Sequence, residues 1–499
     1  MLDGNEVNGR GEDREIDLNE LDPALPVQRV GETVVHRALG PASVRVVLTL
    51  ALPTIVEQVL QAVVGLTDTI LAGHLPGDAG VVAAASAAVG TITYLQWFAG
   101  LMTSAFGVGA TAIVARSIGG RRYRRANRVA GSALTGAFAV GVCVALVLYL
   151  FAREVMWLSG LRGLAVDMGA QFLRIMAITI SLQTAAQIGL ASLRGAGDTL
   201  RPMLVTAGVV VLNLITSLTL TYGWAGFPAM GIRGIALGTM LAYLAGGIAT
   251  VALLMSGKTR LRLRLRHLKP SFPVLQRVLR IGLPSWLEGM LLWLGQFLIV
   301  AFVINTTDTA IGLPGVTMAA HNAVLRIESI AFLPGFGFGI AASALVGQYL
   351  GAGRPDEARH AARLANRLAL ATMTALAIPM VLFPGTMLGW LVDSPPVVRT
   401  GYWPLVLAGL AQPGFAVAII MGAGLKGAGE TVRPMLSTIT GTFLVRVPIL
   451  LALLWIFTRM GHRDWGLIAV WVGIFVDLNY RAVFNSIVFL KGDWQRKKV

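Results

Sequence analysis

Long apolar stretches, separated by short polar ones, fill the chain from about residue 43 to residue 490. A membrane-spanning helix needs about 20 mainly apolar residues, and twelve of these stretches are that long. They form two series of six, at 43–72, 81–112, 129–151, 166–190, 203–222 and 232–255, and at 278–304, 316–346, 364–383, 402–421, 435–457 and 466–490. The pattern predicts an all-α polytopic membrane protein with twelve transmembrane helices.

The composition excludes a soluble enzyme. Hydrophobic residues make up 55% of the 499 residues and charged residues only 13%, whereas about 25% charged residues is usual for soluble domains. The single cysteine, Cys143, excludes an internal disulfide and a cysteine-based metal site. We expect no catalytic residues, no metal site and no cofactor.

The net charge of +16 lies almost wholly in short loops. Basic residues follow the second apolar stretch and fill the central linker, while the loops at 73–80 and 305–315 contain no lysine or arginine. Because positive charge marks the cytoplasmic side of spans, this asymmetry places both termini in the cytoplasm of a multi-pass protein of the plasma (inner) membrane. The basic stretches are therefore interpreted as topology and lipid-headgroup features, with no nucleic-acid partner.

Five segments follow from these boundaries. Residues 1–42 are acidic and lack the apolar core of a signal peptide, which predicts a disordered cytosolic tail. The others are a six-helix bundle at 43–256, a basic cytoplasmic linker at 257–277, a second six-helix bundle at 278–490 and a cytoplasmic tail at 491–499.

An internal repeat relates the two bundles. The segment LRGAGDTLRPML at 193–204 recurs as LKGAGETVRPML at 425–436, and Gly119 and Gly351 are separated by the same offset. Glu57 and Glu288 each follow a Leu-Pro pair, at almost that offset. Because each repeat holds an even number of spans, the two bundles enter the membrane in the same direction. In the repeated loop, the glycines are expected to make a sharp turn and Asp198 or Thr199 to cap the next helix.

The chain resembles the multidrug and toxic compound extrusion (MATE) transporters over about residues 43–490. The resemblance rests on Leu-Pro at 52–53, TDTILAG at 67–73, SIG at 117–119, GQYLGAG at 347–353 and both Gly-Ala-Gly loops, with a similar eighth span from AHN at 320–322 to PGFG at 334–337. It implies a V-shaped carrier, not an enzyme, that exports organic, often cationic, compounds in exchange for H⁺ or Na⁺ by alternating access. Its partners would be small organic molecules and membrane lipids, and the internal two-fold removes the need for a dimer, so we expect a monomer.

A polar stripe in the first span is the candidate cation-coupling site. Glu57, Gln61 and Asp68 lie with Val64 at i, i+4, i+11 and i+7, on one helical face that is expected to border a wet cavity. The resemblance ties Asp68 and Asn213 to cation coupling. Where many relatives have an aspartate one turn after this asparagine, the chain has Ser217, which favours H⁺ over Na⁺.

Polar residues of the seventh and eighth spans are the candidate substrate or proton pathway: Glu288, Gln296, His321, Asn322, Arg326 and Glu328. We hypothesise that Arg326 pairs with Glu288 or Glu328 and leaves a net negative charge for a cationic substrate or a proton. The opposing interpretation is a closed structural ion pair between two helices. His321 fits a packed, hydrogen-bonded role as well as a proton relay.

Other functions stay open from sequence alone. A flippase or exporter of a lipid-linked or endogenous metabolite would share the two-bundle design. A membrane-embedded transferase needs clustered aspartates for a metal, and no span has two within a turn. A channel would need a ring-forming filter, which the two asymmetric polar clusters do not resemble.

Overall fold

The structure, a computed structural model, describes residues 40–497, except for the side chains at positions 97, 99, 102, 103, 296–302 and 304–306. The predicted N-terminal tail therefore lies almost wholly outside the described residues. Everything that is described is helix, turn or loop, which confirms the all-helical class.

The first half of the chain forms six long helices: α2 (Val44–Gly73), α3 (Ala79–Gly119), α4 (Tyr123–Leu150), α6 (Leu164–Gly195), α7 (Leu200–Tyr222) and α8 (Ile232–Met255). The second half forms α9 (Phe272–Ile311), α10 (Val316–Gly351), α11 (Pro355–Leu382), α13 (Pro395–Gly427), a segment of α14 (Val432–Thr440), η3 (Gly441–Arg446) and α15 (Val447–Arg459), and α16 (Gly466–Lys491). Short helices α5 (Ala152–Leu158) and α12 (Pro384–Gly389) follow α4 and α11.

Eleven of the described helical segments are long and apolar enough to cross a membrane. The 40-residue α9 is the twelfth long helix. These twelve segments correspond to the twelve predicted apolar stretches, and several of them continue well beyond the predicted ends because the helices extend past the apolar core.

The helix boundaries follow from local chemistry. Asp78 Oδ1 accepts a hydrogen bond from Val81 N at 2.8 Å and caps α3. In the two repeated loops, Gly197 and Gly429 have φ of +84° and +83°, a conformation that favours glycine. Asp198 then accepts from the backbone N–H of Arg201 at 3.3 Å. The predicted turn is confirmed. Of the two predicted caps, Thr199 is the N-cap residue but makes no side-chain cap, whereas Asp198, one residue before it, bonds to the first turn of α7.

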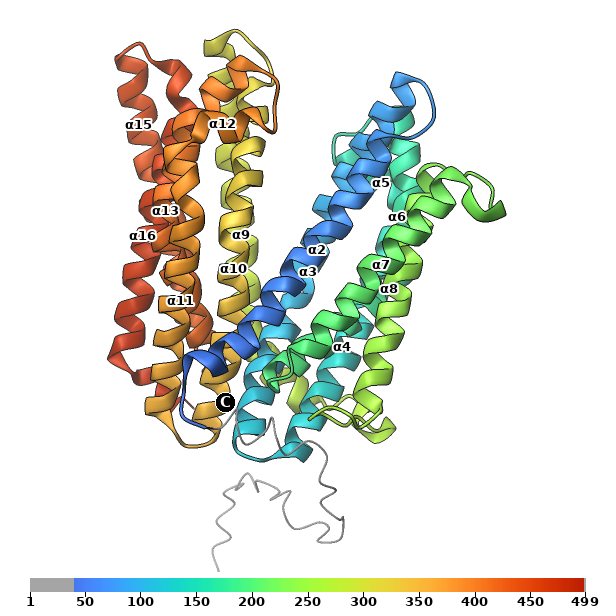
Figure 1. The fold of residues 1–499 in the computed structure, drawn as a ribbon, viewed down its shortest axis with the longest axis vertical. Coiled ribbons are helices and arrows are strands. Elements are labelled where there is room, and N and C mark those ends of the chain that lie inside the picture. Colours follow the sequence, from blue (N-terminus) through green and yellow to red (C-terminus); the bar gives the residue numbers. More distant parts are fainter. Residues whose placement is uncertain (1–39, 498–499) are drawn as a thin grey trace, which may run out of the picture.

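The helices form two groups that diverge like a V (Figure 1). The groups meet at the end where the C-terminus lies and separate toward the end that carries α5 and α12. The basic loop after α3 and the central linker lie at the end where the groups meet, which we call the basic end. The two groups of helices therefore diverge away from the basic loops.

Two glycines allow the halves to meet at the basic end. A Cβ on Gly119 would overlap the carbonyl oxygen of Gln348, and a Cβ on Gly351 would overlap that of Arg116. Gly119 and Gly351 are equivalent positions of the two repeats, and Arg116 and Gln348 are equivalent as well. The helices α3 and α10 therefore cross in backbone contact close to the pseudo-two-fold axis.

The first helix of each half also packs against the other half at this end. Thr54 of α2 donates a hydrogen bond to the carbonyl oxygen of Gly337 in α10 at 3.0 Å. In α9, Gly282 lies so close to Ala105 of α3 that a side chain would overlap its carbonyl group. Both helices contain an internal proline near these contacts, Pro53 and Pro284.

The Gly351→Ala variant is expected to be destabilised by about 3 kcal/mol, because its methyl group would meet backbone rather than a side chain that can move. Gly208→Ala is the matched control, since a Cβ there meets nothing within 4 Å and alanine favours helix. Unfolding of both variants in the same detergent measures the difference. Equal stability of the two variants would contradict the close crossing.

Candidate functional site

A cavity of about 1530 Å³ lies between the two groups of helices and is lined by both. Glutamines from the first half contribute uncharged amides to its wall: Gln58, Gln61, Gln96, Gln183 and Gln187. The charged residues among its described lining are Arg194, Glu288, Arg326, Lys426 and Arg481. The predicted site residue Gln61 is exposed on this wall, whereas Glu57 and Asp68 of the same stripe are buried within the first half.

Asp68 lies in a small polar cluster near the open end of α2. Thr239 of α8 donates its hydroxyl to the Asp68 carboxylate, 3.0 Å from either oxygen, and accepts from Asn213 Nδ2 at 2.9 Å. Asp68 is 5% exposed and Asn213 is 1% exposed. Among the described residues, no lysine, arginine or histidine lies within ion-pair distance of Asp68. The structure thus joins two of the four residues predicted for cation coupling, Asp68 and Asn213, through a further residue, Thr239.

Asn213 completes this cluster. Its Nδ2 also lies 3.3 Å from the Ser217 hydroxyl, one turn along α7. Its Oδ1 is buried and has no hydrogen-bond partner in the described chain. The cluster therefore combines one carboxylate with neutral amide and hydroxyl groups.

Glu57 belongs to a separate cluster. Arg194 Nη1, at the end of α6, lies 2.5 Å from Glu57 Oε1, and the Thr206 hydroxyl of α7 lies 3.5 Å from the same oxygen. The Glu57 side chain is 2% exposed and the Arg194 side chain 13%. Glu57 is thus the buried half of an ion pair whose arginine borders the cavity.

The second half repeats this cluster at the equivalent positions. Lys426 Nζ, at the end of α13, lies 2.8 Å from Glu288 Oε2, and Thr438 of α14 donates to Glu288 Oε1 at 3.1 Å. These three residues occupy the same places in the second repeat as the glutamate, arginine and threonine of the first cluster do in the first repeat. Each half therefore holds one carboxylate, one cation and one threonine where its first, fourth and fifth long helices meet.

The two ion pairs differ in burial, and this predicts unequal energies. Glu288 and Lys426 are 16% and 26% exposed, so water screens them more than it screens Glu57 and Arg194. Double-mutant cycles with Glu→Gln and Arg/Lys→Gln, read from unfolding, should give about 2 kcal/mol of coupling for Glu57–Arg194 and below about 1 kcal/mol for Glu288–Lys426. The reverse order would show that burial does not govern the two pairs.

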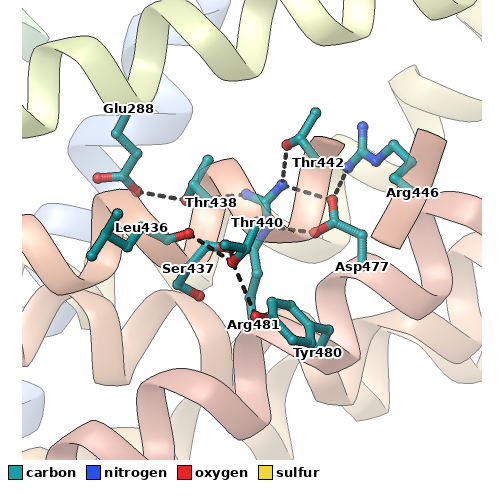
Figure 2. Close-up of polar contacts among 10 residues, drawn as sticks. All are labelled: Glu288, Leu436, Ser437, Thr438, Thr440, Thr442, Arg446, Asp477, Tyr480 and Arg481. Atoms are coloured by element: carbon teal, nitrogen blue, oxygen red, sulfur yellow. Dashed lines mark hydrogen bonds and ion pairs between the residues drawn. The ribbon is translucent and has the colours of Figure 1, made fainter. Parts of the chain in front are cut away.

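Within the second half, a charged network extends from Glu288 of α9 to α16 (Figure 2). Arg481 of α16 contacts Thr438 at 3.4 Å and Thr442 at 2.9 Å, and its guanidinium binds Asp477 through bonds of 2.7 and 2.6 Å. Arg446 reaches the same carboxylate at 2.6 Å. Asp477 is fully buried. One carboxylate thus holds two guanidinium groups.

A local break in the helix positions this network. Residues Gly441–Arg446 form a π-helical turn between α14 and α15, a distortion that is common at functional sites. A side chain at Gly441 would overlap the Asp477 carboxylate. The glycine therefore lets α16 bring Asp477 against this turn.

The predicted pairing of Arg326 is wrong. Glu288 pairs with Lys426, and Glu328 lies 3.4 Å from Gln412 Nε2. Arg326 is exposed on the cavity wall, and it forms no ion pair within the described chain. The sequence did not identify these partners, because Lys426 and Gln412 both come from α13, which is far along the chain from Glu288 and Glu328.

The other predicted residues of this cluster are dispersed. His321 is 3% exposed, lies 5.8 Å from the Trp471 ring between centroids, and has no described hydrogen-bond partner at Nδ1. Asn322 is half-buried, and the side chain of Gln296 lies outside the described residues. The structure therefore does not join His321 to Glu328, and it packs this histidine against a ring.

Several residues of the site were not predicted from the sequence: Arg194, Thr206, Thr239, Lys426, Arg446, Asp477 and Arg481. A signal for two of them exists, because Asp477 and Arg481 are spaced i, i+4 inside an apolar span, where charges are costly. The contact of Thr239 with Asp68 joins two helices that are far apart in the sequence, for which the chain gives no local signal.

Comparison with known proteins agrees with the repeat and the fold. The MatE family model matches the chain twice, at residues 53–219 and 284–451. The "Probable multidrug resistance protein NorM" of Thermotoga maritima is 27% identical over 453 residues, covering 91% of this chain and 93% of that protein. The "Uncharacterized transporter YisQ" of Bacillus subtilis is 23% identical, covering 89% and 95%.

A solved structure described as an outward-facing conformation of a multidrug resistance MATE family transporter has the same fold. Its TM-score is 0.80 at 22% identity, and the match covers 93% of this chain and 99% of that one. The two family matches together span about two thirds of the chain and include both of its halves. The chain therefore belongs to the MATE family of membrane transporters and is not an enzyme.

Proposed function

We propose that the chain is a proton-driven antiporter that exports organic compounds from the cytoplasm by alternating access. The observation that carries the proposal is the pairing of a large cavity between two halves with a buried carboxylate, Asp68, that has no basic partner among the described residues. A carboxylate without a cation can take up and release a proton, and a change of its charge alters the energy of the surrounding helices.

The basic loops give the proposal a direction. If the basic end faces the cytoplasm, as the positive-inside rule predicts, both termini are cytoplasmic. The two groups of helices then diverge toward the outside. Export then requires a second state in which the crossing of α3 and α10 at Gly119 and Gly351 opens instead. Because each chain contains both halves of the cavity, a monomer suffices.

Protons fit the Asp68 cluster better than sodium. A bound sodium ion needs several oxygen ligands around it, and here the carboxylate already accepts the Thr239 hydroxyl. Ser217 stands where a second carboxylate would strengthen a cation site. One carboxylate among neutral groups supports exchange of one proton.

The proposal is tested in bacterial cells that lack their own drug-efflux pumps and that express this chain in the plasma membrane. A panel of fluorescent organic dyes of different charge should include compounds that accumulate less in expressing cells. A protonophore should abolish this difference, whereas removal of external sodium should leave it unchanged. Equal accumulation of every dye in expressing and control cells would favour the alternative, a flippase or exporter of a lipid-linked or endogenous metabolite.

A further inference from the structure

Every described charged residue of the cavity wall except one forms an ion pair. Arg194 pairs with Glu57, Lys426 with Glu288, and Arg481 with Asp477. In each of these ion pairs, the carboxylate and the cation belong to the same half of the chain. Arg326 lines the same cavity, is exposed, and has no acidic partner in the described chain.

Apolar side chains adjoin this guanidinium. Along α10, Ile330, Leu333 and Phe336 line the cavity at spacings of i+4, i+7 and i+10 from Arg326, which places them on one face of the helix. Ile330 is 64% exposed and Phe336 is 42% exposed. The α12 region adds Trp390 to the same cavity, 77% exposed.

A cation without an ion-pair partner in the described chain, beside exposed apolar side chains, matches one class of ligand. A guanidinium forms paired, charge-assisted hydrogen bonds with a carboxylate, sulfonate or phosphate. Covering the exposed apolar side chains with an apolar part of the ligand lowers the free energy, because both surfaces leave water. The opposite wall offers glutamine amides, which bind polar groups of either kind without adding charge.

We propose that Arg326 anchors an anionic group of the transported compound, so that the cavity selects amphipathic organic anions and zwitterions. This inference rests on the proposed transport function for its biological meaning, and it departs from the cationic substrates that the family resemblance implies. The apolar body lies along the α10 face that carries Ile330 and Phe336, and the charged group lies at Arg326.

Equilibrium binding tests the proposal without any ion gradient, so its outcome is independent of whether transport is proton-driven. The probes are dansyl-phenylalanine, which carries one carboxylate, and its neutral carboxamide. The full chain is placed in nanodiscs of zwitterionic lipid, and binding is followed by fluorescence polarisation against empty nanodiscs. The acid should bind about tenfold more tightly than the amide, the factor expected for one charge-assisted contact.

Three variants locate the contact. Arg326→Gln should weaken binding of the acid about tenfold and leave binding of the amide within twofold, and Arg326→Lys should recover part of the loss. Arg174→Gln is the matched control, because Arg174 is the eleventh residue of α6, as Arg326 is of α10, is also exposed, and does not line the cavity. This variant should bind both probes as the wild type does.

Equal affinity of the wild type for acid and amide would overturn the proposal, as would an Arg326→Gln variant that loses both probes equally or a wild type that binds neither. An added arm separates soluble anions from lipid headgroups. If nanodiscs with phosphatidylglycerol reduce acid binding to the wild type but not amide binding, an anionic lipid headgroup occupies the same site. If phosphatidylglycerol leaves acid binding unchanged, the site prefers soluble organic anions to anionic lipid headgroups.

Discussion

Asp68→Asn is expected to abolish gradient-driven transport, with a loss of at least tenfold, while the protein remains folded. The asparagine has the same shape and its Oδ1 can still accept the Thr239 hydroxyl, so the cluster keeps its hydrogen bond. What the variant loses is the ability to exchange a proton, because an amide does not titrate in this range. The measurement is energised uptake into everted vesicles, with unfolding temperature recorded on the same preparation.

Asp167→Asn is the control for this prediction. It also removes one carboxylate from the first half, but Asp167 is 48% exposed and forms only a surface pair with Arg153. Its transport should equal that of the wild type. An Asp68→Asn variant that retains more than half of the wild-type uptake would place the coupling group elsewhere.

Asp477→Asn should be the most destabilising of the polar substitutions, by about 3–5 kcal/mol, the usual consequence of removing one partner from a buried ion pair. Asp477 is fully buried, Arg446 is 5% exposed at its side chain and Arg481 is 9% exposed. Without the carboxylate, two guanidinium groups lose the acid that they share. Denaturant unfolding of the purified protein measures the effect.

Replacement of the whole network separates charge from packing. Combining Asp477→Leu with Arg446→Met and Arg481→Met should recover much of the lost stability, because apolar side chains of similar size have no desolvation cost. Asp493→Asn serves as the surface control, since Asp493 is 63% exposed and should change stability by less than about 0.5 kcal/mol. A stable Asp477→Asn variant would mean that Arg446 and Arg481 are held by other groups.

The fold was predictable because its causes are local. Runs of about 20 apolar residues determine where helices cross the membrane, and the two copies of the Gly-Ala-Gly loop fix the relation of the halves. The positive φ of Gly197 and Gly429 and the cap by Asp198 were also accessible, since each depends on neighbours in the sequence.

The site was only partly predictable because its contacts are not local. The sequence predicted Asp68, Asn213 and Glu57, but their partners Thr239 and Arg194 come from helices that lie far along the chain from α2. The predicted pairing of Arg326 was wrong for the same reason. Arg326 was predicted to pair with Glu288 or Glu328, but Lys426 from α13 pairs with Glu288, and Glu328 contacts Gln412.

Each half contains its own copy of one polar cluster, but the two halves differ in their other buried charged residues. Both hold a carboxylate, a cation and a threonine at equivalent positions. The first half adds a single carboxylate among neutral groups, while the second adds a network of two arginines on one aspartate. This difference is why we place proton coupling at Asp68.

Transport by the purified protein tests the central claim, proton-driven export coupled at Asp68, most directly. Wild-type and Asp68→Asn proteins are reconstituted into liposomes, and a pH gradient or a sodium gradient is imposed separately on a dye identified in the cell assay. The account predicts dye accumulation with the pH gradient alone in the wild type, and none in Asp68→Asn. Accumulation driven by sodium, or an unchanged response to the pH gradient in the variant, would contradict it.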